Sequence, residues 1–355
     1  MSLADRTAVV TGAAGFIGSA VARRLRRDGV RVIAVDTLGY AGHRRTIEAS
    51  LDPARDHFVQ ADIADGRAMQ ELLTRFAPDA VFHLAAETHV DRSIDGPLPF
   101  VATNVLGTAT LFEACRAYRD ALSEDRRAAF RILHISTDEV FGVAPTGGRF
   151  GAHDPHRPNS PYAASKSASD QLARAWGRTF GLPIITTNCC NNYGPFQFPE
   201  KLIPLTIRRA LAGQELRVYG AGDQERDWLY VDDHADALIR AWQVGTSGAV
   251  YLIGSREERQ NLQVVEAICA ALDQRTPWLA PHRRLIRHVT DRPAHDQRYA
   301  VEIAPTAVAL RWTATTPFAV GLQRTIDWYL DNGAWCDVVT AGRYDGARLG
   351  LAEVA

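Results

Sequence analysis

The sequence predicts an α/β protein: a Rossmann-type, doubly wound parallel sheet followed by a smaller mixed α/β domain. Apolar runs of strand length alternate with helical segments from residue 7 to about residue 190, a pattern typical of βαβ units. A glycine-rich turn follows the first of these runs. After residue 195 the expected strands become shorter and turn-forming residues more frequent. We therefore expect one domain at 1–195 and a second at 196–355, with an approximate boundary that segments of the chain can cross.

The order of the expected elements follows from these runs. Apolar and β-branched residues predict strands at 7–11, 31–36, 57–62, 80–86, 131–136 and 183–188. Longer segments predict helices from the glycine turn to about residue 27, at 100–118 and at 162–180. In the second domain we expect short strands at 217–219, 250–252 and 285–289.

The charge of the chain is nearly balanced, with 40 Lys and Arg, 41 Asp and Glu and a formal net charge of -1. No global basic field therefore points to a nucleic acid or a membrane as a partner. No apolar run approaches the roughly 20 residues that a membrane span needs, and the N-terminal residues carry no signal-peptide pattern. The 5 cysteines are scattered and form no C-x-x-C unit, which favours reduced thiols, a cytoplasmic location and no metal site.

The glycine turn is the first functional signal. Gly12, Gly15 and Gly18 form a G-x-x-G-x-x-G unit between a strand and a helix. Such glycines bring a pyrophosphate close to the helix N-terminus, where free N–H groups favour anions. Asp36 ends the second expected strand, where an acidic residue binds ribose hydroxyls and favours NAD over NADP. Asp62 ends the third expected strand, where it can contact the adenine. Together these residues predict an NAD site.

A Tyr-x-x-x-Lys unit is the second signal. The chain contains only two lysines, Lys166 and Lys201, since arginine supplies every other basic residue. Tyr162 and Lys166 lie four residues apart and hence on one helical face. A cation beside a phenol lowers the pKa of that phenol. We therefore expect Tyr162 to act as a base near neutral pH in a hydride-transfer site.

Two adjacent acids follow the fifth expected strand. Thr137, Asp138 and Glu139 fall at its carboxyl end, the edge of an open α/β sheet at which ligands bind. Two neighbouring carboxyl groups can divide their roles, one staying protonated as an acid and one ionised as a base. The pair indicates that the same site also eliminates a leaving group.

Longer stretches of the chain match a known family. They are residues 83–93 (HLAAETHVDRS), 136–142 (STDEVFG), 160–166 (SPYAASK), 191–202 (NNYGPFQFPEKL), 222–228 (GDQERDW) and 291–295 (DRPAH). With the glycine turn, these stretches resemble the extended short-chain dehydrogenase/reductases, and within them the nucleotide-sugar 4,6-dehydratases. The resemblance covers residues 7–335 and is nearest to the dehydratases that act on dTDP-glucose.

The resemblance implies a redox-neutral loss of water with NAD as a retained cofactor. Tyr162 would take the C4 hydroxyl proton while the C4 hydride passes to NAD, and Thr137 would bond near the C4 oxygen. Glu139 would then remove the C5 proton, and Asp138 would protonate the departing C6 hydroxyl. The hydride would return to C6, leaving a 4-keto-6-deoxy sugar nucleotide.

The resemblance also implies two sets of binding residues and a homodimer. For NAD they are Gly12, Gly15, Phe16, Ile17, Gly18, Asp36, Thr37, Leu38, Gly39, Asp62, Ile63, Leu84, Ala85, Ala86, Thr88, Thr103, Tyr162, Lys166 and Asn192. For the nucleotide sugar they are Thr88, Thr137, Asn191, Lys201, Leu202, Arg217, Val218, Tyr219, Arg226, Asn261, Asp291, Arg292 and His295. Lys201, Arg226 and Arg292 suit a diphosphate. The implied dimer would form through the helices at 100–118 and 162–180.

Three alternatives stay open at this point. Arg217 and Ala294 replace the Pro and Gly usual in the family and fall among the implied nucleotide contacts, so a UDP- or CDP-linked sugar is one alternative. A nucleotide-sugar 4-epimerase is another, although it needs no acid pair. The third is a non-catalytic NAD-binding sensor, which would not need Tyr162, Lys166 or the acid pair.

Overall fold

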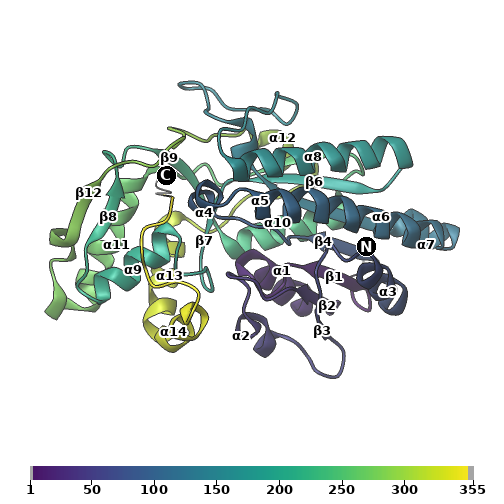
Figure 1. The fold of residues 1–355 in the computed structure, drawn as a ribbon, viewed down its shortest axis with the longest axis horizontal. Helices are drawn as coiled ribbons and strands as arrows, with labels where there is room; N and C mark the ends of the chain where they lie inside the picture. The colour runs from purple at the N-terminus through teal and green to yellow at the C-terminus, as the bar shows by residue number, and fades with distance from the viewer. Residues whose placement is uncertain (1–2, 351–355) are drawn as a thin grey trace.

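A seven-stranded parallel sheet forms the larger part of the fold (Figure 1). The computed structural model describes residues 3–350, so the ends of both predicted domains, at 1–2 and 351–355, lie outside the described residues. The sheet has the order β10-β6-β5-β4-β1-β2-β3. Its strands are β1 (Thr7–Thr11), β2 (Arg31–Asp36), β3 (His57–Gln60), β4 (Ala80–His83), β5 (Arg131–Thr137), β6 (Ile184–Cys189) and β10 (Val250–Ile253). This order reverses direction at β1 and β4, as in a doubly wound sheet, and confirms the predicted fold class.

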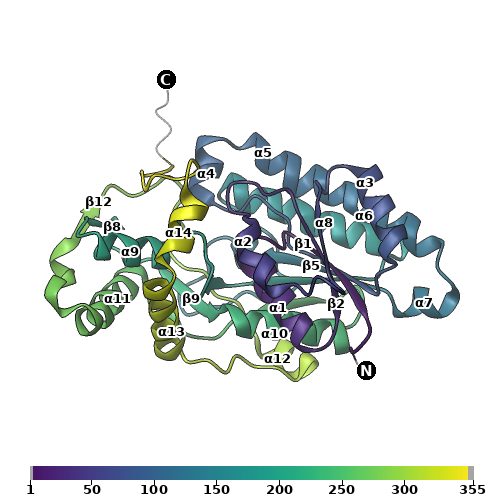
Figure 2. The ribbon, with the colours of Figure 1, turned by 90° about the horizontal axis from the view of Figure 1, so that it is seen from below.

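Helices cover both faces of the sheet (Figure 2). On one side lie α1 (Phe16–Arg27) and α10 (Val231–Val244), and on the other lie α3 (Gly66–Phe76), α6 (Thr108–Asp120) and α8 (Pro161–Phe180). The alternation of side chains along β1 connects it to both layers: Val10 packs in the core under α1 and α10, and Val9 in the core with Phe112 of α6. Burial on both faces explains why these strands read as continuous apolar runs.

One strand of the large sheet comes from the C-terminal half of the chain. β10 pairs in parallel with β6, and α10, just before it, packs on α1. Residues 250–252 lie beyond the approximate boundary at residue 195, which segments of the chain were expected to cross, and β10 is such a segment. Its apolar run is buried on the large sheet because it satisfies the free backbone edge of β6. The domain boundary at residue 195 otherwise stays a prediction.

The rest of the C-terminal half forms a smaller unit with its own core, which includes Ile203, Val264 and Ile326. Its two small sheets have the orders β11-β9-β7 and β12-β8. The strands are β7 (Asn191–Tyr193), β8 (Leu216–Tyr219), β9 (Glu225–Tyr230), β11 (Glu258–Gln260) and β12 (Ile286–Val289). The helices are α9 (Leu202–Leu211), α11 (Asn261–Arg275), α13 (Phe318–Asp331) and α14 (Gly333–Thr340). α12 (Ala304–Leu310) packs instead against α10 and β10 of the large sheet. Short helices elsewhere are α2 (Arg44–Ile47), α4 (Val90–Asp95), α5 (Leu98–Phe100) and α7 (Glu124–Ala129).

The predicted helix at 100–118 is part of a longer helical run. α5, a π-helical stretch (Val101–Gly107) and α6 together span Leu98–Asp120. By length and composition alone this run could cross a membrane, which the sequence analysis overlooked. Its α6 part buries Leu111 and Phe112 on the sheet, which is the position of a core helix.

The glycine turn connects β1 to α1 with no room for side chains. Gly12 has a positive φ of +69°, and a Cβ there would lie 2.8 Å from the backbone of Leu84 and Ala85. A Cβ on Gly18 would lie 2.1 Å from the Gly12 carbonyl oxygen. Gly15 precedes α1 without a side-chain cap, so the first N–H groups of the helix keep no side-chain partner there.

We expect Gly18→Ala to lower the free energy of unfolding by about 1–3 kcal/mol, because the added methyl group overlaps backbone that cannot move aside. Urea unfolding measures the loss. Gly96→Ala is the matched control, since a Cβ at Gly96 meets no atom within 4 Å and its φ is -154°. An equal loss in the two variants would contradict the steric explanation.

Candidate active site

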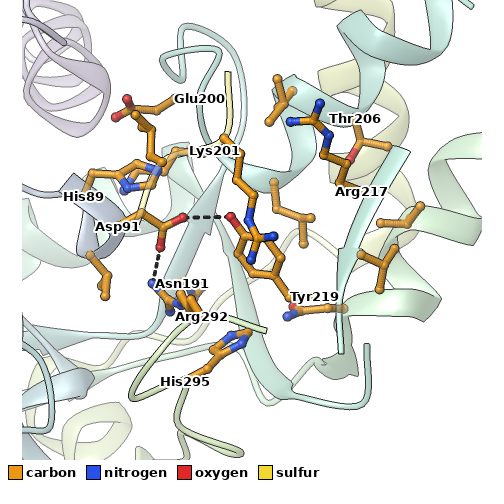
Figure 3. A pocket seen from close by; sticks show the side chains of 18 of the residues that line it. His89, Asp91, Asn191, Glu200, Lys201, Thr206, Arg217, Tyr219, Arg292 and His295 are labelled. Carbon is orange, nitrogen blue, oxygen red and sulfur yellow. Dashed lines mark hydrogen bonds and ion pairs between the residues drawn. The ribbon is translucent and has the colours of Figure 1, made fainter. Parts of the chain in front are cut away.

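Two cavities meet at the carboxyl edge of the large sheet. The larger, of about 450 Å³, is lined by the glycine turn, the ends of β2, β4, β5 and β6, and α8. The smaller, of about 220 Å³, lies towards β8 and α9 (Figure 3). The residues that line both are Thr88, Glu139, Asn191, Glu200 and Lys201. A ligand in one cavity can therefore touch the same side chains as a ligand in the other.

The larger cavity brings together the residues predicted for NAD, with one exception. Leu38 does not line it: its φ is +61° and its side chain packs instead against the core under α1. Every other residue predicted for NAD lines the cavity. Asp36 is held in place because it accepts hydrogen bonds from the N–H groups of Ala14 at 2.9 Å and Leu38 at 2.8 Å. The uncapped N-terminus of α1 and this acidic side chain fit a dinucleotide.

α8 carries the Tyr/Lys pair into the larger cavity. The helix begins where Ser160 Oγ accepts from the Ala163 N–H at 3.1 Å and Pro161 takes the first helical position. Lys166 is 5% exposed, and its Nζ donates to the Ile135 carbonyl at 2.8 Å. Burial lowers the pKa of Lys166, while the Asp170 carboxylate opposes that shift.

The pKa of Tyr162 differs from the expectation. Burial, together with the nearby Glu139 carboxyl group, raises the pKa of Tyr162 well above its usual value. This is opposite to the lowering by Lys166 that the sequence predicts. Burial of the phenol is the largest cause, and Lys166 Nζ donates to the Ile135 carbonyl.

The acid pair lies in a short 3₁₀ helix, Asp138–Phe141, that follows β5. Thr137 Oγ1 accepts from the Glu139 N–H at 3.3 Å and donates to Asp138 Oδ1 at 3.4 Å. Asp138 Oδ2 and Glu139 Oε2 are buried with no hydrogen-bond partner among residues 3–350. Both oxygens are thus available to a ligand.

The two carboxyl groups have different electrostatic surroundings. Burial, Glu139 and Asp227 raise the pKa of Asp138 well above its usual value. Burial also raises the pKa of Glu139, but Arg292, Arg226 and Lys201 oppose that shift. This favours a protonated Asp138 beside a more acidic Glu139.

A buried carboxylate beneath the site was missed from the sequence. Asp170, one helical turn after Lys166, accepts from His134 Nε2 at 3.0 Å, from Ser136 Oγ at 3.0 Å and from Asn188 Nδ2 at 2.9 Å. Burial opposes its ionisation, yet the bonds and charges around it lower the pKa of Asp170. Its spacing of four residues from Lys166 on the same helix face was the available signal.

The smaller cavity brings together the residues predicted for the nucleotide sugar, with two exceptions. Thr137 lines only the larger cavity. Asp291 lines neither, and instead its Oδ1 accepts from His295 Nδ1 at 2.6 Å. Burial and Arg292 lower the pKa of His295 to about 4, so this ring is neutral at pH 7 and its Nδ1–H donates to the Asp291 carboxylate.

The smaller cavity also contains residues that the sequence analysis did not single out. Asp91 accepts from Tyr219 Oη at 3.0 Å and pairs with Arg292 at 2.6 Å (Figure 3). His89 and Glu200 are buried beside them. These three residues lie within the stretches 83–93 and 191–202 that carried the resemblance. Their burial in the cavity could not be predicted because neighbouring positions in a matched stretch can face opposite ways.

Comparisons with known proteins agree with this arrangement. The model of the GDP-mannose 4,6 dehydratase family matches residues 9–325. A dTDP-glucose 4,6-dehydratase of Xanthomonas campestris pv. campestris is 50% identical over 347 residues, covering 97% of this chain and 99% of the relative. These matches extend over both cavities and not only over the NAD-type sheet.

Two solved structures place the fold among nucleotide-sugar enzymes. A dTDP-glucose 4,6-dehydratase of Streptomyces venezuelae with NAD bound has a TM-score of 0.85 and 39% identity, covering 94% of this chain and 99% of that one. A UDP-glucose 4-epimerase of Thermus thermophilus in complex with NAD has a TM-score of 0.81 and 28% identity, covering 92% and 99%. The identity is higher to the dehydratases than to the epimerase.

The raised pKa of Asp138 has a consequence for stability. The unfolded carboxyl group ionises near pH 4, whereas the folded one stays protonated, so wild-type stability falls as the pH rises above about 4 towards the folded pKa. Asparagine does not ionise. We therefore expect Asp138→Asn to be more stable than the wild type at pH 8, by about 1 kcal/mol or more, with a smaller difference at pH 5.

Guanidinium unfolding at pH 5, 6.5 and 8 measures this difference. Asp5→Asn is the control, because the Asp5 side chain is 97% exposed and should give no gain that grows with pH. A difference for Asp138→Asn that is equal at pH 5 and pH 8 would show that Asp138 is already ionised in the folded protein.

Proposed function

Because the chain belongs to the GDP-mannose 4,6 dehydratase family, we propose that it removes water from dTDP-glucose to give dTDP-4-keto-6-deoxyglucose, with NAD as a retained cofactor. It is then a hydro-lyase. The observation that carries the proposal is the pair of buried Asp138 and half-buried Glu139, which lines the same cavity as Tyr162 and Lys166. The 50% identity to a dTDP-glucose 4,6-dehydratase over nearly the whole chain supports it.

The larger cavity is the proposed NAD site. Its glycine turn and the free N–H groups of α1 would hold the pyrophosphate, and Asp36 the adenosine ribose. When bound, NAD supplies an acceptor for the C4 hydride and a donor of the same hydride to C6. No net oxidation results, so the cofactor need not be exchanged in each cycle.

The Tyr/Lys pair would act at C4 of the sugar. Tyr162 removes the proton of the C4 hydroxyl group, and Lys166, fixed by the Ile135 carbonyl, supplies a cation beneath it. Thr137 Oγ1, at the N-terminus of the acid-bearing 3₁₀ helix, would hydrogen-bond the same C4 oxygen. The resulting C4 ketone acidifies the proton on C5.

The acid pair would then carry out the elimination. Glu139, whose pKa is restrained by Lys201, Arg226 and Arg292, removes the C5 proton. Asp138, held protonated by burial, gives a proton to the departing C6 hydroxyl group. A 4-epimerase needs neither step, which is why this pair favours a dehydratase over an epimerase.

The smaller cavity is the proposed site for the nucleotide. Lys201 and Arg292 line this cavity together with Glu139 and with Arg217, Val218 and Tyr219, so a diphosphate bound there would bridge the glucose and the nucleoside. Arg217, Val218 and Tyr219 of β8 would then meet the base.

We further propose a cytoplasmic homodimer. Leu98, Val101 and Leu106 on the helical run before α6 are 77%, 51% and 63% exposed. Val101 and Leu106 belong to the helix at 100–118 that the resemblance places in the dimer together with the helix at 162–180, and Leu98 extends the same apolar group. Burial of this group in a dimer also accounts for the apolar composition of the run. All 5 cysteines are unpaired and buried, which suits a reducing compartment.

The activity is tested by mass spectrometry in deuterated water with catalytic NAD. We expect dTDP-glucose to lose one water and gain one deuterium at C5, while UDP-glucose and GDP-mannose in separate tubes stay unchanged. Water loss from UDP-glucose or GDP-mannose would instead indicate the same reaction on a different nucleotide sugar. C4 inversion without water loss would instead indicate an epimerase, and no turnover a non-catalytic NAD-binding protein.

In the same assay, Glu139→Gln separates the oxidation at C4 from the later elimination of water. Because Tyr162 and Lys166 remain, we expect enzyme-bound NADH to form on addition of dTDP-glucose, seen as absorbance at about 340 nm, with product formation reduced about 100-fold or more. Wild-type rates of product formation in this variant would refute the role of Glu139 as the base.

The dimer has its own test. We expect Leu106→Arg to convert the protein to a monomer in light scattering coupled to gel filtration, because a buried unpaired charge at an interface costs several kcal/mol. Val308→Arg is the matched control, since Val308 is 80% exposed on α12, away from this helical run. A monomeric wild type, or a dimeric Leu106→Arg variant, would refute the proposed interface.

A further inference from the structure

The segment after α14, Ala341–Gly350, lies against both cavities. It leaves the helix and runs past α4, which Figures 1 and 2 both place beside it. Its residues 344 and 346–349 line the smaller cavity. Neither the motifs nor the matched stretches of the sequence reach this segment, which begins beyond residue 335.

One end of the segment is fixed to the loop of the larger cavity. Arg343 Nη1 donates to the carbonyls of Gly39 at 2.9 Å and Gly42 at 2.7 Å, and its Nη2 reaches the Leu38 carbonyl at 3.5 Å. Gly39 and Gly42 line the proposed NAD site. Arg343 therefore holds the loop after Asp36 in place by bonding to its backbone carbonyls.

The other end carries Arg348 to the proposed nucleotide site. The Arg348 guanidinium lies over the Tyr219 ring, 4.9 Å from its centroid, and donates to the Thr290 carbonyl. Its Nε is buried and has no hydrogen-bond partner among residues 3–350. A buried guanidinium N–H without an acceptor is costly, so a ligand that supplies one would be favoured here.

Further bonds hold Arg348 in this position. Arg209 Nη1 donates to the Gly346 carbonyl at 3.1 Å, and Tyr344 Oη donates to the Ala347 carbonyl at 3.0 Å. The Gly350 N–H donates to Asp95 of α4 at 2.9 Å. A Cβ on Gly350, whose φ is +75°, would lie 3.0 Å from Asp91 Cβ, so the segment approaches α4 closely. The segment is tied on both sides of the smaller cavity.

We propose that Arg348 is a further binding residue for the nucleoside diphosphate part of the substrate, and that Ala341–Gly350 is a strap that positions it. The proposal rests on the proposed function and adds a residue to it. Arg348 lines only the smaller cavity, whereas Tyr162, Lys166 and Asp138 line only the larger one and Glu139 lines both. A planar guanidinium stacked on Tyr219 can offer its free N–H groups to a phosphate or to a base carbonyl.

The test uses the full-length, NAD-loaded protein and thymidine diphosphate, with affinity measured by calorimetry. We expect Arg348→Ala to bind about 10-fold or more weakly than the wild type, because a charged hydrogen bond is lost. Arg348→Lys should recover little, since it keeps the charge and loses the planar fork. Arg67→Ala is the control: its side chain is 89% exposed and lines neither cavity, so its affinity should match the wild type.

Turnover distinguishes binding from structural damage. Arg348→Ala should raise KM for dTDP-glucose by about the same factor as the dissociation constant, with kcat within about 3-fold of the wild type. A purely structural role would lower Tm or kcat and leave the affinity of folded protein unchanged. Affinity for thymidine diphosphate within about 2-fold of the wild type in Arg348→Ala would overturn the assignment.

Arg343→Ala tests the strap. The Arg343 side chain bonds to the loop of the other cavity and does not line the smaller one, so a loss of nucleoside diphosphate affinity in this variant is an indirect effect. We expect Arg343→Ala to bind thymidine diphosphate about 3-fold or more weakly than the wild type, and unchanged binding would overturn the strap.

If the wild type binds uridine diphosphate in place of thymidine diphosphate, the proposed base is wrong and the same variants are compared with that ligand. If it binds no nucleoside diphosphate, the proposed function fails, and this assignment with it.

Discussion

The site depends on one buried carboxylate, that of Asp170. Its oxygens accept hydrogen bonds from His134 and Ser136 on β5 and from Asn188 on β6, while Asp170 itself belongs to α8. The helix that carries the Tyr/Lys pair is thereby fixed in register with the strand that ends in the acid pair. An isolated buried charge would be expensive, but three donors and the nearby Lys166 ammonium group compensate it. Catalysis that needs groups from two elements at fixed distances gains most from such a tie.

Burial acts on both carboxyl groups of the acid pair, but the charges that surround the two groups differ. It raises the pKa of Asp138 well above its usual value, and it also raises the pKa of Glu139, where three cations oppose the shift. Those cations are themselves held by the chain: Lys201 donates to the Thr88 carbonyl at 3.1 Å, and Arg292 pairs with Asp91. The charges are thus in place before any substrate arrives, so little reorganisation remains for the reaction itself.

Sequence reasoning reached the parts of the protein in which function depends on local spacing. The glycine turn, the Tyr/Lys pair and the acid pair each occupy one strand end or one helix turn, and the structure places them in one cavity. It failed where the position depends on the three-dimensional path of the chain. β10 joins the large sheet because β6 has a free edge, which no local pattern reveals. Leu38 turns into the core because its backbone is left-handed. The segment around Arg348 reaches the substrate side from beyond every matched stretch.

The strand β10 also determines how the protein can be divided. Because Val250–Ile253 forms the outer edge of the large sheet, the part that surrounds the proposed cofactor is not a continuous piece of chain. A fragment that stops at the end of β6 would leave that strand as an open edge, with unpaired backbone groups and the apolar surface beneath α10 uncovered. The sheet around the proposed cofactor is therefore completed late in synthesis, because its last strand follows β7, α9, β8 and β9 of the smaller unit along the chain.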